Sequence, residues 1–276
     1  MKIIYLALIF LIISCKIFAQ QLPDVQVLAV LAPKGLKVDG KAGDWNEAFA
    51  ARNDRTQLFY TLANDDKNLY LIIKSATSSS TNKIMMGGIT FVVNSQGKKK
   101  EKDGVSITYP LINRANRGQG GRTGNNQNRQ AGQGGFQNRS QQNSQQRDSI
   151  LMITRKAQLA TVKEIKISGV KTIQDSLISI YNEYGVKAVA NINTTGDYIY
   201  ELSIPLSLLE LNANQEFAYQ IKVNGMSNIS LGANGSFGGG NFGGGRQNAG
   251  GNGGGKTFQD LMSATDFWGK YTLAKP

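Results

Sequence analysis

Two low-complexity segments constrain the fold of this chain more than any other feature of its sequence. The first runs from about Asn113 to Arg147 and is nearly all Gly, Asn, Gln, Arg and Ser; the second, from about Gly232 to Gly255, is rich in Gly and Asn. Neither has enough apolar side chains to offset the entropy of ordering its backbone, so both are expected to be disordered. Because long loops cost little when their ends are close in space, we predict one domain, residues 21–276, with two insertions.

The start of the chain has the order of a secretory signal peptide, which we place at residues 1–20. Lys2 precedes an uncharged apolar run, Ile3–Ile13, and Ala19 precedes a cleavage point at Gln20 or Gln21. The apolar run is shorter than the roughly 20 residues of a transmembrane helix. We therefore expect a protein exported to the periplasm, the outer surface or the exterior, with no transmembrane segment.

Cys15 is the only cysteine, so an intramolecular disulfide is excluded. Ile12-Ile13-Ser14-Cys15 resembles a bacterial lipobox, in which the cysteine is lipidated and becomes the mature N-terminus. The residues that follow, Lys16–Gln20, are more typical of the end of an ordinary signal peptide. We expect ordinary cleavage, with a lipoprotein attached through Cys15 as the alternative.

The basic charge of the chain is concentrated in the first insertion. The formal net charge is +12, and removing Lys2 and Lys16 leaves +10. The insertion supplies six of these charges and no acid: Arg114, Arg117, Arg122, Arg129, Arg139 and Arg147. Clustered arginines attract phosphates and other anions, and their Arg-Gly pairs faintly resemble RGG-type nucleic-acid segments. Since export argues against a dedicated nucleic-acid role, we expect contacts with anionic surface polymers, or a loop that only maintains solubility.

The remaining sequence consists of strand-length apolar runs separated by polar turns. Leu58, Tyr60 and Leu62 alternate with other residues, as in a half-buried strand. Asn64–Asn68 and Asn193–Asp197 have the composition of hairpin turns. The predicted strands are Val25–Leu31, Thr56–Ala63, Leu69–Lys74, Ile89–Asn94, Val105–Ile112, Lys163–Ser168, Val186–Asn193, Tyr198–Ile204, Glu216–Asn224 and Phe267–Leu273. About ten short strands predict an all-β fold, a two-sheet antiparallel β-sandwich.

A few segments are expected to depart from this strand pattern. Pro205 cannot donate a backbone hydrogen bond and should end its strand. Leu206–Leu211 is then expected to form a short helical turn, and Ser149–Thr161 and Thr257–Met262 are candidates for helix.

Four sequence landmarks follow one another between Leu36 and Leu273: an Asp39-Gly40 turn followed by Trp45, an acidic turn followed by Leu69-Tyr70, a Glu201-x-x-Ile204-Pro205 strand end, and Trp268-Gly269 before a last strand. Taken in this order, they resemble family 9 carbohydrate-binding modules and their sandwich relatives. The resemblance implies a sandwich with framework residues Asp39, Gly40, Trp45, Tyr70, Glu201, Pro205 and Trp268.

Sugar binding needs exposed aromatic faces, and the resemblance implies an aromatic clamp at a cleft. No clamp pair is evident, because both tryptophans, Trp45 and Trp268, occupy framework positions. The candidate ligand-binding residues are therefore Tyr109, Tyr181, Tyr184 and Trp268.

The composition argues against catalysis. The absence of histidine excludes Ser-His-Asp triads and histidine metal sites. The acids Asp65-Asp66, Glu101, Asp103 and Glu210 are typical of turns and surfaces, not of a glycosidase pair. No run has EF-hand spacing, although the resemblance leaves a structural calcium ion open. We expect no enzyme, no cofactor and no other metal.

Two functions are consistent with these features. The first is a non-catalytic carbohydrate-binding-like domain at the bacterial envelope or outside the cell, with a polysaccharide or glycan as partner. The alternative is a structural or adhesive surface protein whose basic loops contact anionic polymers.

Overall fold

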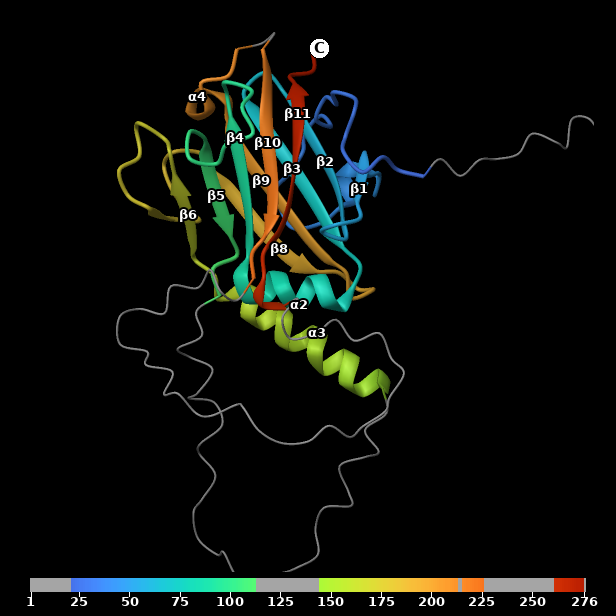
Figure 1. The fold of residues 1–276 in the computed structure, drawn as a ribbon. Helices are drawn as coiled ribbons and strands as arrows, with labels where there is room; N and C mark the ends of the chain where they lie inside the picture. Colours follow the sequence, from blue (N-terminus) through green and yellow to red (C-terminus); the bar gives the residue numbers. More distant parts are fainter. Residues whose placement is uncertain (1–20, 113–143, 213–214, 226–260, 276) are drawn as a thin grey trace, which may run out of the picture.

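The chain folds as two antiparallel β-sheets packed face to face (Figure 1). The computed structural model describes residues 21–112, 144–212, 215–225 and 261–275. The five-stranded sheet has the order β1 (Ala51–Asn53), β2 (Leu58–Asn64), β3 (Asn68–Ser75), β9 (Tyr198–Pro205) and β8 (Lys187–Ile192). The six-stranded sheet has the order β11 (Thr265–Thr272), β10 (Glu216–Val223), β4 (Ile89–Asn94), β5 (Val105–Tyr109), β6 (Glu164–Ser168) and β7 (Leu177–Ser179). The predicted two-sheet antiparallel sandwich is confirmed.

The main core lies between the two sheets. Leu58, Tyr60 and Leu62, the alternating residues of β2, are all 0% exposed. The hydroxyl groups of Tyr60 and Tyr219 form a 2.9 Å hydrogen bond that joins the sheets through the core. Burial raises the pKa of Tyr60 to about 12, although its hydrogen bonds with Tyr219 and the Gln26 amide lower the pKa. The phenol therefore stays protonated.

Residues 21–50 cross the molecule without joining either sheet, and the strand predicted for Val25–Leu31 is wrong. Leu31 alone forms an isolated bridge, with Asn64, and Val27 and Leu28 are 80% and 75% exposed. Side chains, not a neighbouring strand, satisfy much of this backbone. The Tyr271 hydroxyl, for example, accepts from Val30 N at 2.9 Å and donates to Val30 O at 3.1 Å. An apolar run therefore does not form a strand where side chains bond its peptide groups.

A second, smaller core covers the outer face of the five-stranded sheet. Trp45, Tyr70 and Ile199 are buried there together, and apolar residues of the crossing segment, Leu36 and Val38 among them, pack against them. Trp45 ends a short 3₁₀ helix, η1 (Gly43–Trp45).

Two helices close one end of the sandwich and a third lies at the opposite end (Figure 1). α3 (Ser144–Ala160) contains the predicted Ser149–Thr161 helix apart from Thr161, and α4 (Leu206–Leu209) is the predicted helical turn. α2 (Ser78–Gly87) was not predicted, because its Ser- and Thr-rich sequence is typical of a loop. It forms because Thr77 caps its N-terminus and Ile84 and Met85 are buried in the core. No helix in the described ranges is long and apolar enough to cross a membrane.

Both low-complexity insertions fall largely in the gaps between the described ranges. The first was predicted to extend to Arg147, but α3 begins at Ser144, so Arg147 belongs to a helix. The expected disorder of residues 113–143 and 226–260, the signal peptide and most of the candidate helix Thr257–Met262 lie outside the described residues. The second insertion joins β10 to β11, and its ends adjoin, since a Cβ added at Gly225 would lie 2.1 Å from the Met262 carbonyl oxygen.

Candidate functional site

Two of the four sequence landmarks meet at one buried carboxylate. Glu201, in the middle of β9, is 1% exposed. Its Oε1 accepts from Trp45 Nε1 at 2.7 Å, and its Oε2 accepts from the backbone N–H groups of Asp39 and Gly40 at 2.8 and 2.7 Å. Burial raises the pKa of Glu201, while these three donors act in the opposite direction. The cluster therefore fastens the crossing segment to the five-stranded sheet.

The Asp39-Gly40 turn is held directly against β8. Gly40 has φ +77°, and a Cβ there would lie 3.0 Å from Asn191 Cβ and 3.2 Å from Val189 Cγ1. Only glycine accommodates both the dihedral angle and the close approach. As a result, the segment that follows the turn runs beside β8 and the β8–β9 hairpin.

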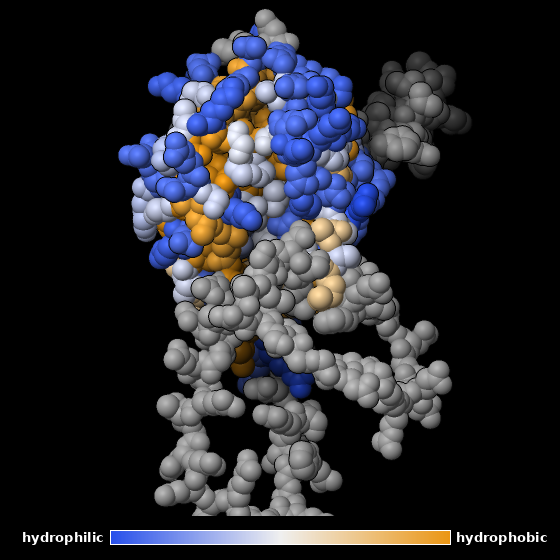
Figure 2. Space-filling model, turned by 60° about the vertical axis from the view of Figure 1, so that its left-hand side comes forward, coloured by the Kyte–Doolittle hydropathy of each residue, from blue (hydrophilic) through white to orange (hydrophobic). Residues whose placement is uncertain are grey.

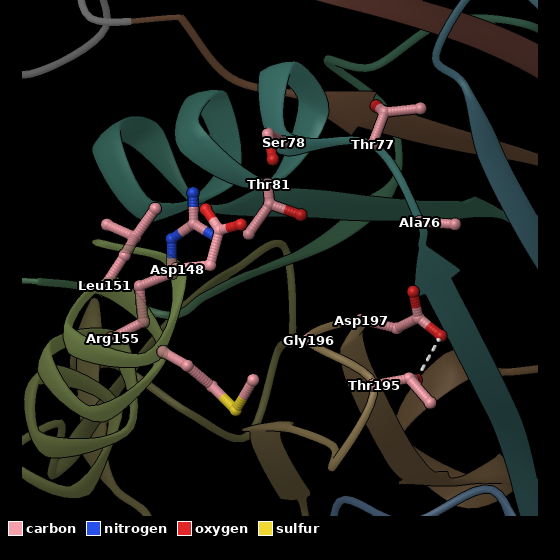
Figure 3. A pocket seen from close by; sticks show the side chains of 11 residues that line it. Ala76, Thr77, Ser78, Thr81, Asp148, Leu151, Arg155, Thr195, Gly196 and Asp197 are labelled. Carbon is pink, nitrogen blue, oxygen red and sulfur yellow. Dashed lines mark hydrogen bonds between the residues drawn. The ribbon is translucent and has the colours of Figure 1, made fainter. Parts of the chain in front are cut away.

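A depression lies between this segment and the hairpin. Its main part has a volume of about 550 Å³, and the lining includes Phe49, Lys74, Asn191, Asn193, Thr195 and Asp197. A second part of about 210 Å³ shares Thr195 and Asp197 with the first and continues toward α2 and α3 (Figure 3). We call the two parts together the hairpin depression. Its size falls within the usual range for small-molecule sites, about 300–1,000 Å³.

The hairpin turn presents its polar groups in a fixed arrangement. Asn193 Oδ1 accepts from the backbone N–H groups of Thr195 and Asp197 at 3.0 and 2.8 Å. Asp197 Oδ2 accepts from the Thr195 hydroxyl at 3.0 Å (Figure 3). Asp197 Oδ1 has no hydrogen-bond partner among the described residues, so it is available to a ligand.

The part of the depression next to α3 contains a buried cation. Arg155 is 7% exposed, and its Nη2 donates to Asn82 Oδ1 at 2.6 Å. Burial lowers the pKa of Arg155, and the nearby charge of Asp148 acts in the opposite direction. In Figure 3 the side chains of Arg155 and Asp148 extend from α3 toward Thr81 of α2. A positively charged hydrogen-bond donor and negatively charged acceptors therefore both line this part of the depression.

Phe49 supplies the aromatic surface of the depression. Its ring is half-buried and lies 6.0 Å from the ring of Phe59, with a 57° angle between the planes. Lys74 Nζ lies 5.1 Å from each ring centroid, a favourable cation–π distance. The ring is thus held at a fixed position in the wall.

A second groove, of about 540 Å³, lies on the outer face of the six-stranded sheet. Figure 2 shows this side of the molecule, where apolar and weakly polar surface lies between hydrophilic margins. Its floor carries a hydroxyl pair, Thr90 and Thr108, 2.8 Å apart, and Lys222 forms a 2.5 Å ion pair with Glu101 at its margin. None of the described residues that line it is aromatic. The hairpin depression is therefore the better candidate for a sugar.

The four aromatic residues proposed from sequence lie in different environments. Tyr109 is 4% exposed and stacks on Tyr200 in the core, 5.9 Å between centroids, so its assignment to a ligand surface is corrected. Tyr181 is 80% exposed, Tyr184 packs against the main core, and Trp268 lies half-buried on the outer face of the six-stranded sheet. None of the four lines the hairpin depression.

The remaining predicted residues occupy separate places. Arg147 is exposed on α3, and the other five arginines, Arg114, Arg117, Arg122, Arg129 and Arg139, lie outside the described residues. Tyr70 is buried, as a framework residue should be, and donates to Asp65 Oδ2 at 2.8 Å. Pro205 is the last residue of β9, so its predicted role in ending the strand is confirmed.

The residues of the hairpin depression were missed for identifiable reasons. Phe49 stands alone in a polar stretch and has no aromatic partner nearby in sequence. The composition of Asn193–Asp197 predicted a turn between two strands. It did not predict that this turn lines the same depression as Phe49. The available signal was the Asp39-Gly40 turn, because it fixes the start of the segment that leads to Phe49 against β8.

Metal binding has no visible basis in the described part of the chain. Within these residues, no three acidic side chains gather closely enough to hold a metal ion. The carboxylate of Asp65 is instead used in its own turn. Desolvation would raise its pKa, but hydrogen bonds from Lys67 N, the Tyr70 hydroxyl and Asn68 N together lower it.

Comparisons with known proteins give a structural likeness. No protein-family model matches the sequence, and no curated protein matches it. The chain is similar to a solved carbohydrate-binding module of family 9 from Caldicellulosiruptor kristjanssonii, determined in complex with glucose. The identity is 11%, the TM-score is 0.31, and the match covers 71% of this chain and 77% of that chain. That solved module belongs to the family that the four sequence landmarks of this chain resemble.

Proposed function

We propose that this chain is an exported, non-catalytic carbohydrate-binding domain whose sugar site is the hairpin depression. One observation carries the proposal: Phe49 shares a single depression with amide, hydroxyl and carboxylate groups of β8 and the β8–β9 turn. Sugars combine an apolar C–H face with a rim of hydroxyl groups, and this lining offers a partner for each.

The expected binding mode follows from that lining. The C–H face of a pyranose packs on Phe49, and its hydroxyl groups bond to Asn191, Asn193 and the open oxygen of Asp197. Site groups that are already fixed by the turn lose little entropy on binding. The order of the four landmarks supports the same class of function.

The test is a binding screen with the mature protein, beginning at Gln21, against neutral and anionic polysaccharides at low and high salt. We expect binding to a neutral glycan that changes little with salt, and recovery of that glycan unhydrolysed. Binding only to anionic polymers, lost at high salt or on deletion of residues 113–143, would instead support the adhesive alternative.

A substitution locates the site. Phe49→Ala should weaken binding about 10-fold, since losing most of one stacked apolar face costs about 1.4 kcal/mol. The matched control is Tyr181→Ala, which removes an aromatic ring that is 80% exposed and outside the depression. Equal affinities for wild type and Phe49→Ala, with a loss in Tyr181→Ala, would move the site elsewhere.

A further inference from the structure

The smaller part of the hairpin depression extends beyond the groups that hold the sugar in the proposed binding mode. It has a volume of about 210 Å³ and lies between the β8–β9 turn, α2 and α3 (Figure 3). Phe49, Asn191 and Asn193 line the larger part and not this one. Thr195 and Asp197 line both parts, so the two spaces meet at the turn. We call the smaller part the α3 recess.

A carboxylate and a guanidinium group face the α3 recess from α3 without pairing. Asp148 and Arg155 both line it, and they are seven residues apart, about two helical turns, so they lie on one side of the helix. The charge of Asp148 acts on Arg155, but no ion pair within 4.0 Å joins the two side chains. The gap between them leaves room for a group that accepts from one and donates to the other.

Most of the hydrogen-bonding capacity of these two groups is open. Arg155 Nη2 donates to Asn82 Oδ1 at 2.6 Å, and the other guanidinium N–H groups have no hydrogen-bond partner among the described residues. In the same part of the chain, the Asp148 carboxylate accepts no hydrogen bond. Since Arg155 is 7% exposed, its position is fixed by the surrounding structure and not by solvent. The recess therefore presents a positioned donor and an open acceptor to a ligand.

The α3 recess also has an apolar side. Met152 lies against the tip of the hairpin, since a Cβ added at Gly196 would be 3.7 Å from Met152 Cε. Leu151, which is 41% exposed, lines the recess next to it. Apolar surface beside charged hydrogen-bonding groups matches the C–H face and hydroxyl rim of a sugar ring.

We infer that the α3 recess is a second sugar subsite, in which Asp148 and Arg155 select the unit next to the one that packs on Phe49. A hydroxyl group both donates and accepts, so neighbouring hydroxyls of one ring can accept from Arg155 and donate to Asp148. Hydrogen bonds to charged groups are stronger than those between neutral groups. The substrate class is therefore an oligosaccharide of two or more units that runs past the β8–β9 turn. This inference rests on the proposed function, because it needs the first unit in the larger part of the depression.

The experiment compares glucose, mannose and xylose with their dimers, cellobiose, mannobiose and xylobiose, by titration calorimetry of the mature protein. We expect at least one dimer to bind about 10-fold more tightly than its monomer, the gain from a charge-assisted hydrogen bond. Asp148→Ala should bring that dimer to within about twofold of its monomer. The matched control is Asp175→Ala, which removes an exposed acid between β6 and β7 that lines neither part of the depression. It should keep the full preference for the dimer.

The outcomes separate this inference from the proposed function. Arg155→Gln should also remove the preference, and if that buried substitution prevents folding, the exposed Asp148 decides the test. Dimers that bind no more tightly than monomers, or a preference that survives Asp148→Ala, would overturn the second subsite while the site at Phe49 stands. Phe49→Ala should weaken monomer and dimer alike. Absence of binding by all of these sugars and by every polysaccharide of the screen would overturn the proposed function itself.

Discussion

Glu201 shows how single residues hold distant parts of this chain together. Its carboxylate takes hydrogen bonds from Trp45 and from the Asp39-Gly40 turn, about 160 residues earlier in the chain. Each hydrogen bond alone adds little net stability, but a buried carboxylate without any of these donors would carry a large desolvation cost. The Trp268-Gly269 landmark has a similar structural basis, because a Cβ at Gly269 would lie 2.3 Å from the ring of Tyr219.

We predict that Trp45→Phe destabilises the protein by about 2 kcal/mol or more, since it leaves a buried carboxylate oxygen of Glu201 without its donor. The control is Trp268→Phe, at a half-buried tryptophan on the outer face, which should change stability by less than about 0.5 kcal/mol. Urea unfolding of both variants checks this. Equal stability of the two would mean that the Glu201 cluster does not hold the crossing segment.

At the residue scale, sequence patterns identified framework residues better than site residues. Trp45, Tyr70 and Glu201 are buried together, and their spacing along the chain carried the resemblance. Phe49 and Asp197 carry no local pattern, because only the folded chain brings them to one depression. Aromatic residues chosen by type alone, such as Tyr109, were placed in the wrong environment.

At the scale of elements, alternation and turn chemistry predicted the hairpins well. β2 and β3 pair as the predicted hairpin, with Tyr60 opposite Ile73, and β4 spans the predicted Ile89–Asn94. The failures have physical causes. The Tyr60 hydroxyl, not a neighbouring strand, accepts from the Gln26 backbone N–H, and tertiary packing stabilises α2 against its weak helix propensity.

The connection between β10 and β11 provides an element-scale prediction. Gly225 and Met262 adjoin, so replacing residues 226–260 by a two-residue turn should leave the sandwich intact. We expect the unfolding midpoint to change by only a few degrees and neutral-glycan affinity to stay unchanged. Thermal unfolding by circular dichroism, with calorimetry, measures both; loss of the cooperative transition would show that the insertion contributes to the core.

At the scale of the whole molecule, the described residues form two separate depressions large enough for a sugar. The hairpin depression lies between the crossing segment and the β8–β9 hairpin, and the groove of Figure 2 lies on the six-stranded sheet. Of these, the hairpin depression alone combines an aromatic lining residue with polar groups held in place by a turn. This combination is the basis for assigning the sugar site there.

The most direct test of that assignment is amide chemical-shift mapping of the mature protein, titrated with the strongest neutral glycan from the screen. The account predicts that shifts concentrate at residues 40–49 and 191–197, and that Phe49→Ala removes them at the same glycan concentration. Shifts concentrated at residues 90–108 and 222–224, with the hairpin unaffected, would contradict it and place the site on the six-stranded sheet.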